Sequence, residues 1–357
     1  MKVVHVVGAR PNFMKVAPVI EAIRGSLRFD QRLVHTGQHY DANMSDVFIS
    51  ELGIPAPTEN LNVGSGSHAQ QTAEVMLRFE KVIRDDRPDL VVVYGDVNST
   101  VAAALVCAKE LIPVAHVEAG LRSGDRRMPE EVNRLLTDQL ATLLLTPSAD
   151  ADRNLLKEGR PADAIHFVGN VMIDTLVRSL PHARRPGFDL PNRYVLVTLH
   201  RPSNVDETGS LSVLLDALAD IGQSVPVVFP VHPRTRRQLD EIGFRGSSAV
   251  RLVDPVGYLE FLFLQKHASV VVTDSGGIQE ETTFLGVPCV TMRETTERPV
   301  TVDVGTNVLS GRDVAKMRTH VERAVAGSWK QGSVPERWDG HASDRIVSVL
   351  REWAARH

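Results

Sequence analysis

The sequence is poor in cysteine, and it has no long apolar run. Its two cysteines among 357 residues, Cys107 and Cys289, each stand in a short apolar run, so we expect buried thiols of a reducing compartment rather than a disulfide. No apolar run reaches the roughly 18 residues that a membrane span needs, so we expect no membrane as a partner. Cysteine and histidine form no cluster with the spacing of metal ligands, and we expect no metal site.

A leader pattern, a strong net charge and a dinucleotide fingerprint are also missing from the sequence. The first residues, 1–11, lead into a glycine turn instead of a long apolar core with a cleavage site, so we expect no signal peptide and a cytoplasmic protein. The formal net charge of −4 gives no reason to expect nucleic acid as a partner. The motif G-x-G-x-x-G is absent, which counts against a nicotinamide-dependent dehydrogenase, and we expect no cofactor.

What the sequence does contain is a repeated alternation of apolar and amphipathic segments. The length predicts about two domains, and 43% hydrophobic and 24% charged residues are ordinary for a globular protein. In the first half, the segments predicted as buried strands are Lys2–Gly8, Arg32–Gly37, Asp89–Gly95, Pro113–Ala119 and Leu143–Ser148. Amphipathic segments such as residues 68–86 and 99–111 separate them. This alternation predicts a parallel sheet that helices cover on both faces.

The same alternation restarts after a segment rich in proline. Residues 179–192 hold three prolines and no apolar period, which predicts a linker. The strands predicted after it are Tyr194–His200, Pro226–His232, Val250–Pro255, Val270–Asp274 and Pro288–Arg293. We therefore predict two doubly wound domains, residues 1–178 and 193–338. The amphipathic residues 339–357 are expected to pack back on the first domain.

Several carboxylates directly follow predicted strands of the first domain. Open parallel sheets bind ligands beyond the carboxyl ends of their strands, so Asp96, Glu118, Glu130 and Glu131 should converge on one edge. Asp96 could instead cap a helix, and the two residues after Pro129 suit the first turn of one. Glu118 has no such alternative, because a carboxylate that ends an apolar strand needs a partner or a function.

The first predicted strand leads into Gly8–Lys15, where a glycine turn is followed by Arg10 and Lys15. Two cations near the start of a helix suit a phosphate or a carboxylate. In the second domain, His200 and His232 each end a predicted strand. His200 stands beside an arginine, which favours a functional role, whereas His232 also suits a plain helix start before Pro233.

The stretch Val270–Glu281 ends a strand on Ser275, Gly276 and Gly277. A helix start with two glycines offers backbone amides and a positive dipole end to a diphosphate. A carboxylate later on the helix, Glu281 or Glu280, would accept from a vicinal diol, and Arg298 would add a cation. Neighbouring helix positions point about 100° apart, so one glutamate at most should reach that diol.

Together these motifs resemble the non-hydrolysing UDP-N-acetylglucosamine 2-epimerases. The resemblance covers the chain in order up to about Gly311, and the matching segments are Gly8–Lys15, Gly95–Thr100, His116–Glu131, Thr198–Asn204, Asp274–Glu281 and Thr295–Pro299. It implies an α/β fold of GT-B type, with two Rossmann-like domains that face each other across a cleft. It also implies a homodimer, a UDP-sugar substrate, and no nicotinamide or metal cofactor.

The resemblance assigns roles to particular residues. It places Asp96, Glu118, Glu130 and His200 at the reaction centre. Glu131, Arg122 and His232 are our further candidates. It implies that the substrate and the UDP are bound by Arg10, Lys15, Ser275, Gly276, Gly277, Glu281 and Arg298.

Two departures from the family pattern leave the sugar open. Pro202 and Ser203 stand where the family often has Arg-Glu, and Val300 stands where it often has glutamate. Related epimerases act on a UDP-linked diacetamido uronic acid, and residues 34–45 resemble them too. The alternatives are therefore that sugar, a hydrolysing epimerase, or a GT-B glycosyltransferase that shares the UDP site.

Overall fold

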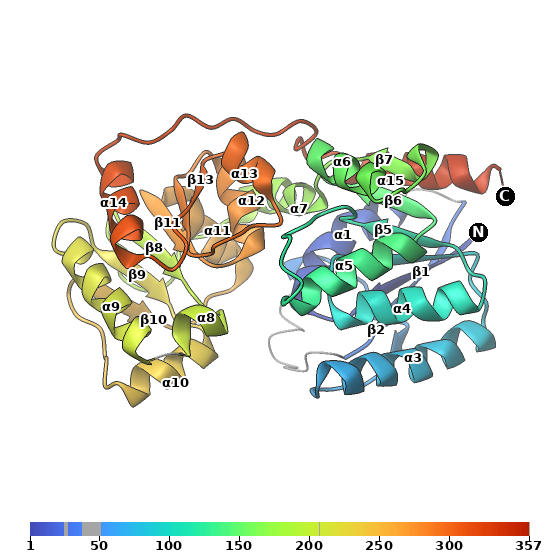
Figure 1. Ribbon diagram of the computed structural model, residues 1–357, viewed down its shortest axis with the longest axis horizontal. Helices are drawn as coiled ribbons and strands as arrows, with labels where there is room; N and C mark the ends of the chain where they lie inside the picture. The colour runs from blue at the N-terminus through green and yellow to red at the C-terminus, as the bar shows by residue number, and fades with distance from the viewer. Residues whose placement is uncertain (25–27, 38–50, 207, 357) are drawn as a thin grey trace. The chain divides into compact units, whose positions relative to one another are not determined.

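The computed structural model describes residues 1–24, 28–37, 51–206 and 208–356 of the chain (Figure 1). These residues form two compact units, of which the first comprises residues 1–178 and 336–357 and the second residues 179–335. The proline-rich segment 179–192 belongs to the second unit, where Leu190 packs into a small apolar core beside Tyr194 and Leu196. Each unit is built on one parallel sheet.

The sheet of the first unit has the strand order β3-β2-β1-β4-β5-β6-β7. Its strands are β1 (Lys2–Val7), β2 (Asp30–His35), β3 (Glu59–Asn60), β4 (Leu90–Tyr94), β5 (Val114–Val117), β6 (Leu143–Thr146) and β7 (Ile165–Phe167). The chain moves outward from β1 in one direction and from β4 in the other. The ends of β1 and β4 therefore form the switch point at which open parallel sheets bind ligands.

Helices cover both faces of this sheet. They are α1 (Arg10–Arg24), α3 (His68–Asp85), α4 (Asn98–Lys109), α5 (Pro129–Leu140), α6 (Ala149–Lys157), α7 (Val171–Ser179) and α15 (Ala342–Ala354). One apolar core includes side chains of α1 and α15, and the other includes those of α3 and α4. The last helix, α15, is red in Figure 1 and lies among the blue and green elements of the first unit. Its side chains Ile346 and Leu350 are buried in the same core as those of α1.

The second unit repeats this plan with the strand order β10-β9-β8-β11-β12-β13. Its strands are β8 (Val195–Thr198), β9 (Val227–Pro230), β10 (Val250–Val253), β11 (Val270–Thr273), β12 (Cys289–Thr291) and β13 (Asn307–Leu309). Its helices are α8 (Pro202–Val205), α9 (Thr208–Gly222), α10 (Pro233–Glu241), α11 (Tyr258–His267), α12 (Gly276–Leu285), α13 (Pro299–Asp303) and α14 (Val314–Val325). The switch point here lies at the ends of β8 and β11.

The predicted α/β class and its two doubly wound sheets are thus confirmed. Every predicted strand is present; β2 starts and ends two residues earlier than predicted, the other strands are shorter than predicted, and three strands were missed: β3, β7 and β13. The missed strands are two or three residues long at sheet edges, where too few residues alternate to give a pattern. Cys107 and Cys289 are buried free thiols, as expected, and burial raises their pKa values to about 12 and about 11. No helix among the described residues has the length and apolar composition to cross a membrane.

Candidate active site

Asp96 lies at the switch point of the first sheet, two residues after the end of β4. Its carboxylate forms an ion pair with Nη1 of Arg134, a buried residue of α5. The Asn133 side chain donates to the carbonyl oxygen of Asp96 at 2.9 Å, so α5 holds both the side chain and the backbone of this residue. Asp96 precedes α4 without capping it: the N-cap residue is Val97, and no side-chain cap bond forms there. The helix-cap alternative is therefore wrong.

Glu118 directly follows β5, and it is buried in a left-handed backbone conformation with φ of 76°. That conformation is uncommon for a residue other than glycine and clusters at functional sites. Its carboxylate forms an ion pair with Nζ of Lys15, which is also buried. A Cβ atom at Gly95 would lie 2.6 Å from that Nζ and 3.6 Å from Oε2 of Glu118. The pair therefore lies against the backbone next to Asp96.

Glu130 and Glu131 occupy the first turn of α5 but have different surroundings. The Glu131 carboxylate is buried and accepts hydrogen bonds from the backbone of Ser123 and Gly124, each at 2.9 Å, and from Arg134. Burial would raise the pKa of Glu131, but these bonds outweigh it and hold the pKa below its ordinary value. Within the described ranges, no hydrogen bond or ion pair involves the half-buried Glu130 carboxylate. Glu131 thus holds the loop at Ser123 and Gly124, whereas Glu130 has no such structural contact among the described residues.

The turn after β1 is fixed by Asn12. Its Oδ1 accepts from the N–H groups of Gly8 and Ala9, and its amide donates to the carbonyl of Tyr94 at 2.8 Å. Side-chain cations near this turn come from α1, which begins at Arg10 and carries Lys15 one turn later. The Arg10 side chain lies outside the described residues. Arg122, a further candidate, contacts Asp138 and Glu158 with its guanidinium.

In the second unit, α12 starts at Gly276, directly after the switch point. The N–H of Ser275 donates to Oγ1 of Thr273 at 3.0 Å, so this amide has a partner within the protein. Among the described residues, none accepts from the N–H of Gly276 or Gly277, as expected for the first turn of a helix. We call residues 275–277 the glycine turn.

Arg298 lies against the glycine turn. A Cβ atom at Gly276 would come within 2.5 Å of its Nη1 and 2.8 Å of Oε1 of Glu297, so a larger residue here would have to displace these two side chains. Its Nε forms an ion pair with Glu280 at 2.7 Å, and its Nη1 pairs with Glu297. Arg293 pairs with the other oxygen of Glu297 at 2.6 Å. The charges of two arginines and two glutamates cancel in this cluster. Arg298 therefore contributes oriented N–H groups rather than a net positive charge.

Glu281 points away from that cluster. Its carboxylate accepts from the hydroxyl of Tyr258 at 2.9 Å and from the amide of Gln265 at 2.5 Å, and all three residues are buried. Glu280, its neighbour, belongs to the arginine cluster. The two glutamates of α12 therefore have separate surroundings, as the 100° rotation between neighbouring helix positions predicts.

His200 follows β8 and is held by Asp274, the last residue before the glycine turn. Nδ1 of His200 lies 2.9 Å from Oδ1 of Asp274, and the backbone N–H groups of His200 and Arg201 donate to the same carboxylate. Nε2 is thus the ring nitrogen left for a ligand. The His232 ring lies 5.8 Å from that of His200 between centroids, and its Nδ1 accepts from the N–H of Arg234 at the start of α10. His232 is therefore a helix cap.

The buried Asp274 should make the stability of the second unit depend on pH in the acidic range. Burial would raise its pKa, but the bonds from His200 and Asn204 outweigh it and lower the pKa below the ordinary 3.8. A carboxyl with a lowered folded-state pKa stabilises the fold above its unfolded pKa and loses this effect as the pH falls through the folded pKa. Asp274→Asn should therefore lower Tm by roughly 5–10 °C at pH 7, and the difference should shrink below pH 3.8 in calorimetric scans.

A matched control for this experiment is Asp254→Asn. Asp254 is 97% exposed on its side chain and lies 3.6 Å from Arg236. Exposed pairs of this kind contribute little to stability, so Tm should change by about 1 °C or less. A Tm difference for Asp274→Asn that stays constant between pH 7 and pH 2 would contradict the assignment.

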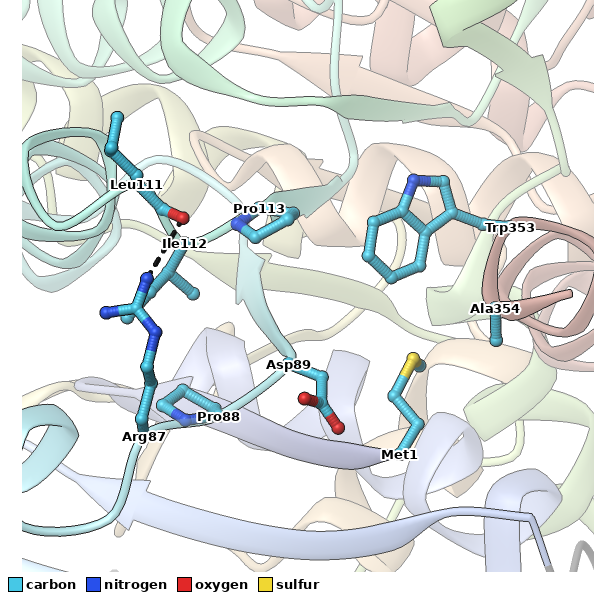
Figure 2. A pocket seen from close by; sticks show the side chains of 9 residues that line it. All are labelled: Met1, Arg87, Pro88, Asp89, Leu111, Ile112, Pro113, Trp353 and Ala354. Atoms are coloured by element: carbon cyan, nitrogen blue, oxygen red, sulfur yellow. Dashed lines mark hydrogen bonds between the residues drawn. The ribbon is translucent and has the colours of Figure 1, made fainter. Parts of the chain in front are cut away.

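A pocket of about 390 Å³ lies elsewhere in the first unit. Figure 2 shows Met1, Asp89 and Pro113 lining it together with Trp353 of α15. The first three residues directly precede β1, β4 and β5, so the pocket lies at the amino ends of these strands. Asp96 and Glu118 follow the carboxyl ends, at the opposite edge of the sheet. The pocket is therefore separate from the carboxylates of Asp96 and Glu118.

The sequence did not predict the residues that contact the site residues from other segments of the chain. Arg134 contacts Asp96 and Glu131, Asp274 holds His200, and Tyr258 and Gln265 contact Glu281. Arg134 carried one signal: it lies three residues after Glu131 on an amphipathic helix, where i,i+3 pairs face each other. The others come from distant segments and have no local signal.

Each unit has a doubly wound parallel sheet, and polar or charged residues suited to binding a ligand follow the strands at its switch point. This architecture is an enzyme fold of GT-B type. A lipopolysaccharide outer core galactosyltransferase shares this fold, with a TM-score of 0.58, 14% identity and 99% of each chain covered, a likeness that concerns the fold alone. The sequence model of the UDP-N-acetylglucosamine 2-epimerase family matches residues 21–351 of this chain. The chain belongs to this family of isomerases.

Individual relatives agree with the family assignment. The UDP-N-acetylglucosamine 2-epimerase of Methanocaldococcus jannaschii is 41% identical, with 98% of this chain and 99% of that protein covered. The crystal structure of this enzyme in complex with UDP-GlcNAc and UDP has a TM-score of 0.90 at 40% identity, and covers 99% of this chain and 100% of that chain. A UDP-2,3-diacetamido-2,3-dideoxy-D-glucuronate 2-epimerase of Pseudomonas aeruginosa is 43% identical, with 98% and 99% covered.

Proposed function

We propose that this protein interconverts UDP-N-acetylglucosamine and UDP-N-acetylmannosamine by epimerisation at C2. The observation that carries the proposal is the group of carboxylates at the switch point of the first sheet, where Asp96 and Glu118 each have a buried cationic partner. A nucleotide-binding fold alone needs no such group. The relative from M. jannaschii, crystallised with UDP-GlcNAc and UDP, supports the choice of sugar.

The reaction requires an indirect route, because no carbonyl flanks the C2 hydrogen of the sugar. In the proposed mechanism, UDP leaves C1 while a base removes the C2 proton, which gives a 2-acetamidoglucal. A proton then arrives on the other face of C2, and UDP adds back to C1. One base and one acid are therefore needed at C2. We assign the proton transfers to Asp96 and Glu130, with Glu118 and its partner Lys15 beside them.

The leaving UDP must be stabilised and retained until it adds back. In our proposal the N–H groups of Gly276 and Gly277 and the dipole of α12 bind the diphosphate, with Ser275 at the same turn. Arg298 directs N–H groups to this place, and Nε2 of His200 donates to a phosphate oxygen. The resemblance also assigns Arg10 to binding of the substrate and UDP. Glu281, with Tyr258 and Gln265, would accept from the ribose hydroxyls.

A second candidate substrate is a UDP-linked diacetamido uronic acid. The relative from P. aeruginosa with that activity is 43% identical, as similar to this chain as the UDP-N-acetylglucosamine 2-epimerases are. Val300 in place of glutamate, and Pro202 with Ser203 in place of Arg-Glu, are the departures that leave the sugar open. The residues proposed for proton transfer at C2 would serve either sugar, because both reactions invert the same carbon.

A hydrolysing epimerase and a GT-B glycosyltransferase are less well supported. A transferase needs one base and an acceptor, which leaves the additional carboxylates without a role. A hydrolysing enzyme would release UDP and free N-acetylmannosamine. We further propose a cytoplasmic homodimer, as the resemblance implies. Leu77 of α3 with Val132 and Leu136 of α5 are exposed apolar side chains on helices that both pack on α4, and they suit a contact between subunits.

Solvent exchange tests the proposed function directly. When the protein is incubated with UDP-N-acetylglucosamine alone in deuterated water, NMR should show UDP-N-acetylmannosamine with deuterium at C2. Deuterium should also enter C2 of the remaining substrate, because the intermediate returns in both directions. Free UDP with free N-acetylmannosamine would instead indicate the hydrolysing reaction. Unchanged substrate without deuterium, together with C2 exchange in the diacetamido uronic acid substrate, would shift the assignment to that sugar.

A further inference from the structure

A buried histidine lies directly behind the proposed catalytic carboxylates. His116 is in the middle of β5, fully buried, and both of its ring nitrogens have partners. Nδ1 lies 2.6 Å from Oδ1 of Asp138, a buried residue of α5. Nε2 lies 2.8 Å from the carbonyl oxygen of Gly95. His116 thus bridges a helix on one side and the loop after β4 on the other.

These partners decide the protonation of the ring. A carbonyl oxygen can only accept, so Nε2 carries a proton that it donates to Gly95. The other oxygen of Asp138 accepts from the N–H of Gly120 at 3.0 Å and from Arg122 at 2.7 Å. Burial would raise the pKa of Asp138, but His116 and Arg122 outweigh it and lower the pKa. Asp138 therefore binds the side chain of His116 through one oxygen and the backbone of Gly120 and the side chain of Arg122 through the other.

Arg122 extends this cluster to a second carboxylate. It forms two hydrogen bonds with Glu158, at 2.8 and 2.6 Å. Arg122 thus pairs with both Asp138 and Glu158. Removing one member would leave a buried charge without compensation, which is why such pairs specify geometry more than they add stability.

The two backbone groups that the cluster binds belong to the loops of the proposed proton-transfer residues. The carbonyl of Gly95 is part of the peptide bond to Asp96, and the N–H of Gly120 lies two residues after Glu118. Gly95, Glu118 and Gly120 all have left-handed backbones, with φ of 61°, 76° and 82°. Glycine adopts this conformation readily, but Glu118 keeps it only where the surroundings fix it.

We propose that His116 and Asp138 form a positioning pair that holds the loops of Asp96 and Glu118 in register for proton transfer at C2. This inference rests on the proposed epimerase function. Both residues of the pair are fully buried, so we assign them no contact with the substrate. Leu144, paired with His116 across β5 and β6, is apolar and fully buried, as core residues of a parallel sheet usually are. A buried polar pair at the neighbouring position therefore needs a reason beyond packing.

Two amide substitutions separate the two bonds of His116. In His116→Asn the side-chain amide reaches the place of Nδ1, so it keeps the contact to Asp138 and loses that to Gly95. In His116→Gln it reaches the place of Nε2, so it keeps the bond to Gly95. We expect kcat to fall about 100-fold in His116→Asn and less than about 10-fold in His116→Gln. KM and the Kd for UDP should stay within about 3-fold of wild type in both variants.

Controls separate positioning from loss of stability. Leu144→Ala removes a buried side chain beside His116 but leaves both loop bonds intact, so kcat per folded protein should change less than about 3-fold while Tm falls. Asp138→Asn is a second test of the pair that changes the side chain less, and it replaces His116→Asn if that variant does not fold. It keeps an oxygen for the N–H of Gly120 but removes the charge, and it should lower kcat about 10-fold at unchanged Kd for UDP.

The outcomes are distinguishable. Equal kcat values for His116→Asn, His116→Gln and wild type would overturn the positioning pair, as would losses that follow Tm alone. Loss of kcat in His116→Asn with recovery in His116→Gln supports it. A wild-type protein that epimerises neither UDP-N-acetylglucosamine nor the diacetamido uronic acid substrate would overturn the proposed function, and this is seen before any variant is compared.

Discussion

Asp96→Asn is expected to lower kcat by about 10²–10⁴-fold, the range that a positioned acid or base contributes. The substitution keeps the size of the side chain and an oxygen for Arg134, but it removes the group that can exchange a proton. Arg134 retains Glu131 as an anionic partner at 2.7 Å, so the first unit should remain folded. The Kd for UDP should not change, because the glycine turn belongs to the second unit. Steady-state kinetics and calorimetric titration with UDP measure both quantities.

The matched control is Asp89→Asn. Asp89 lies just before β4, at the end of this strand opposite to Asp96, and its carboxylate accepts from the backbone of Lys2 at 2.7 Å. We expect kcat within about 2-fold of wild type for this variant, since a surface change away from a functional group has small effects. An Asp96→Asn variant with wild-type turnover would remove Asp96 from the mechanism.

Glu118→Gln is expected to affect both activity and stability. The variant leaves Lys15 as a buried cation without its anionic partner, and breaking a buried ion pair by removing one member costs about 3–5 kcal/mol. The glutamine oxygen still accepts from Lys15, so we expect the lower end of this range. Turnover should fall by at least about 10²-fold, because a carboxylate is lost from the reaction centre. Urea unfolding and kcat of the folded protein are the measurements.

The double variant Glu118→Gln with Lys15→Met separates these two effects. It removes both charges, and replacing a buried ion pair by uncharged side chains of similar size is often close to neutral. Stability should therefore return to within about 1–2 kcal/mol of wild type, whereas kcat should stay low. Recovery of turnover together with stability would mean that Glu118 serves the fold and takes no part in catalysis.

Much of the fold follows from local pattern in the sequence. Val91–Val93 and Val270–Val272 are runs of β-branched residues long enough to be buried on both faces, and both form central strands. The edge strands β3, β7 and β13 are too short for such a pattern and depend on pairing with their neighbours. The helix that begins after Ser67 was also predictable, because Ser67 and Gln70 form a capping box.

The candidate site was predictable in its positions but not in its contacts. Asp96 and Glu118 follow neighbouring strands of a parallel sheet, so their proximity follows from topology. Lys15 was expected to bind the substrate or its diphosphate, and that remains a prediction; the structure adds its ion pair with Glu118. That pair joins residues more than 100 positions apart, and a distant partner leaves no local trace. The same reason hid Asp138 as the partner of His116.

The sequence by itself determined two parallel α/β sheets and the placement of acids after the strands of one and glycines after a strand of the other. Apolar runs of four to six residues that alternate with amphipathic segments have few other ways to bury their side chains. Only the tertiary structure decided which ionisable groups meet. Glu130 and Glu131 are neighbours on one helix, and the packing of α5 on the loop at Ser123 buries one carboxylate and leaves the other half-exposed. Such a choice depends on the rotation of a helix against its sheet, which no single segment encodes.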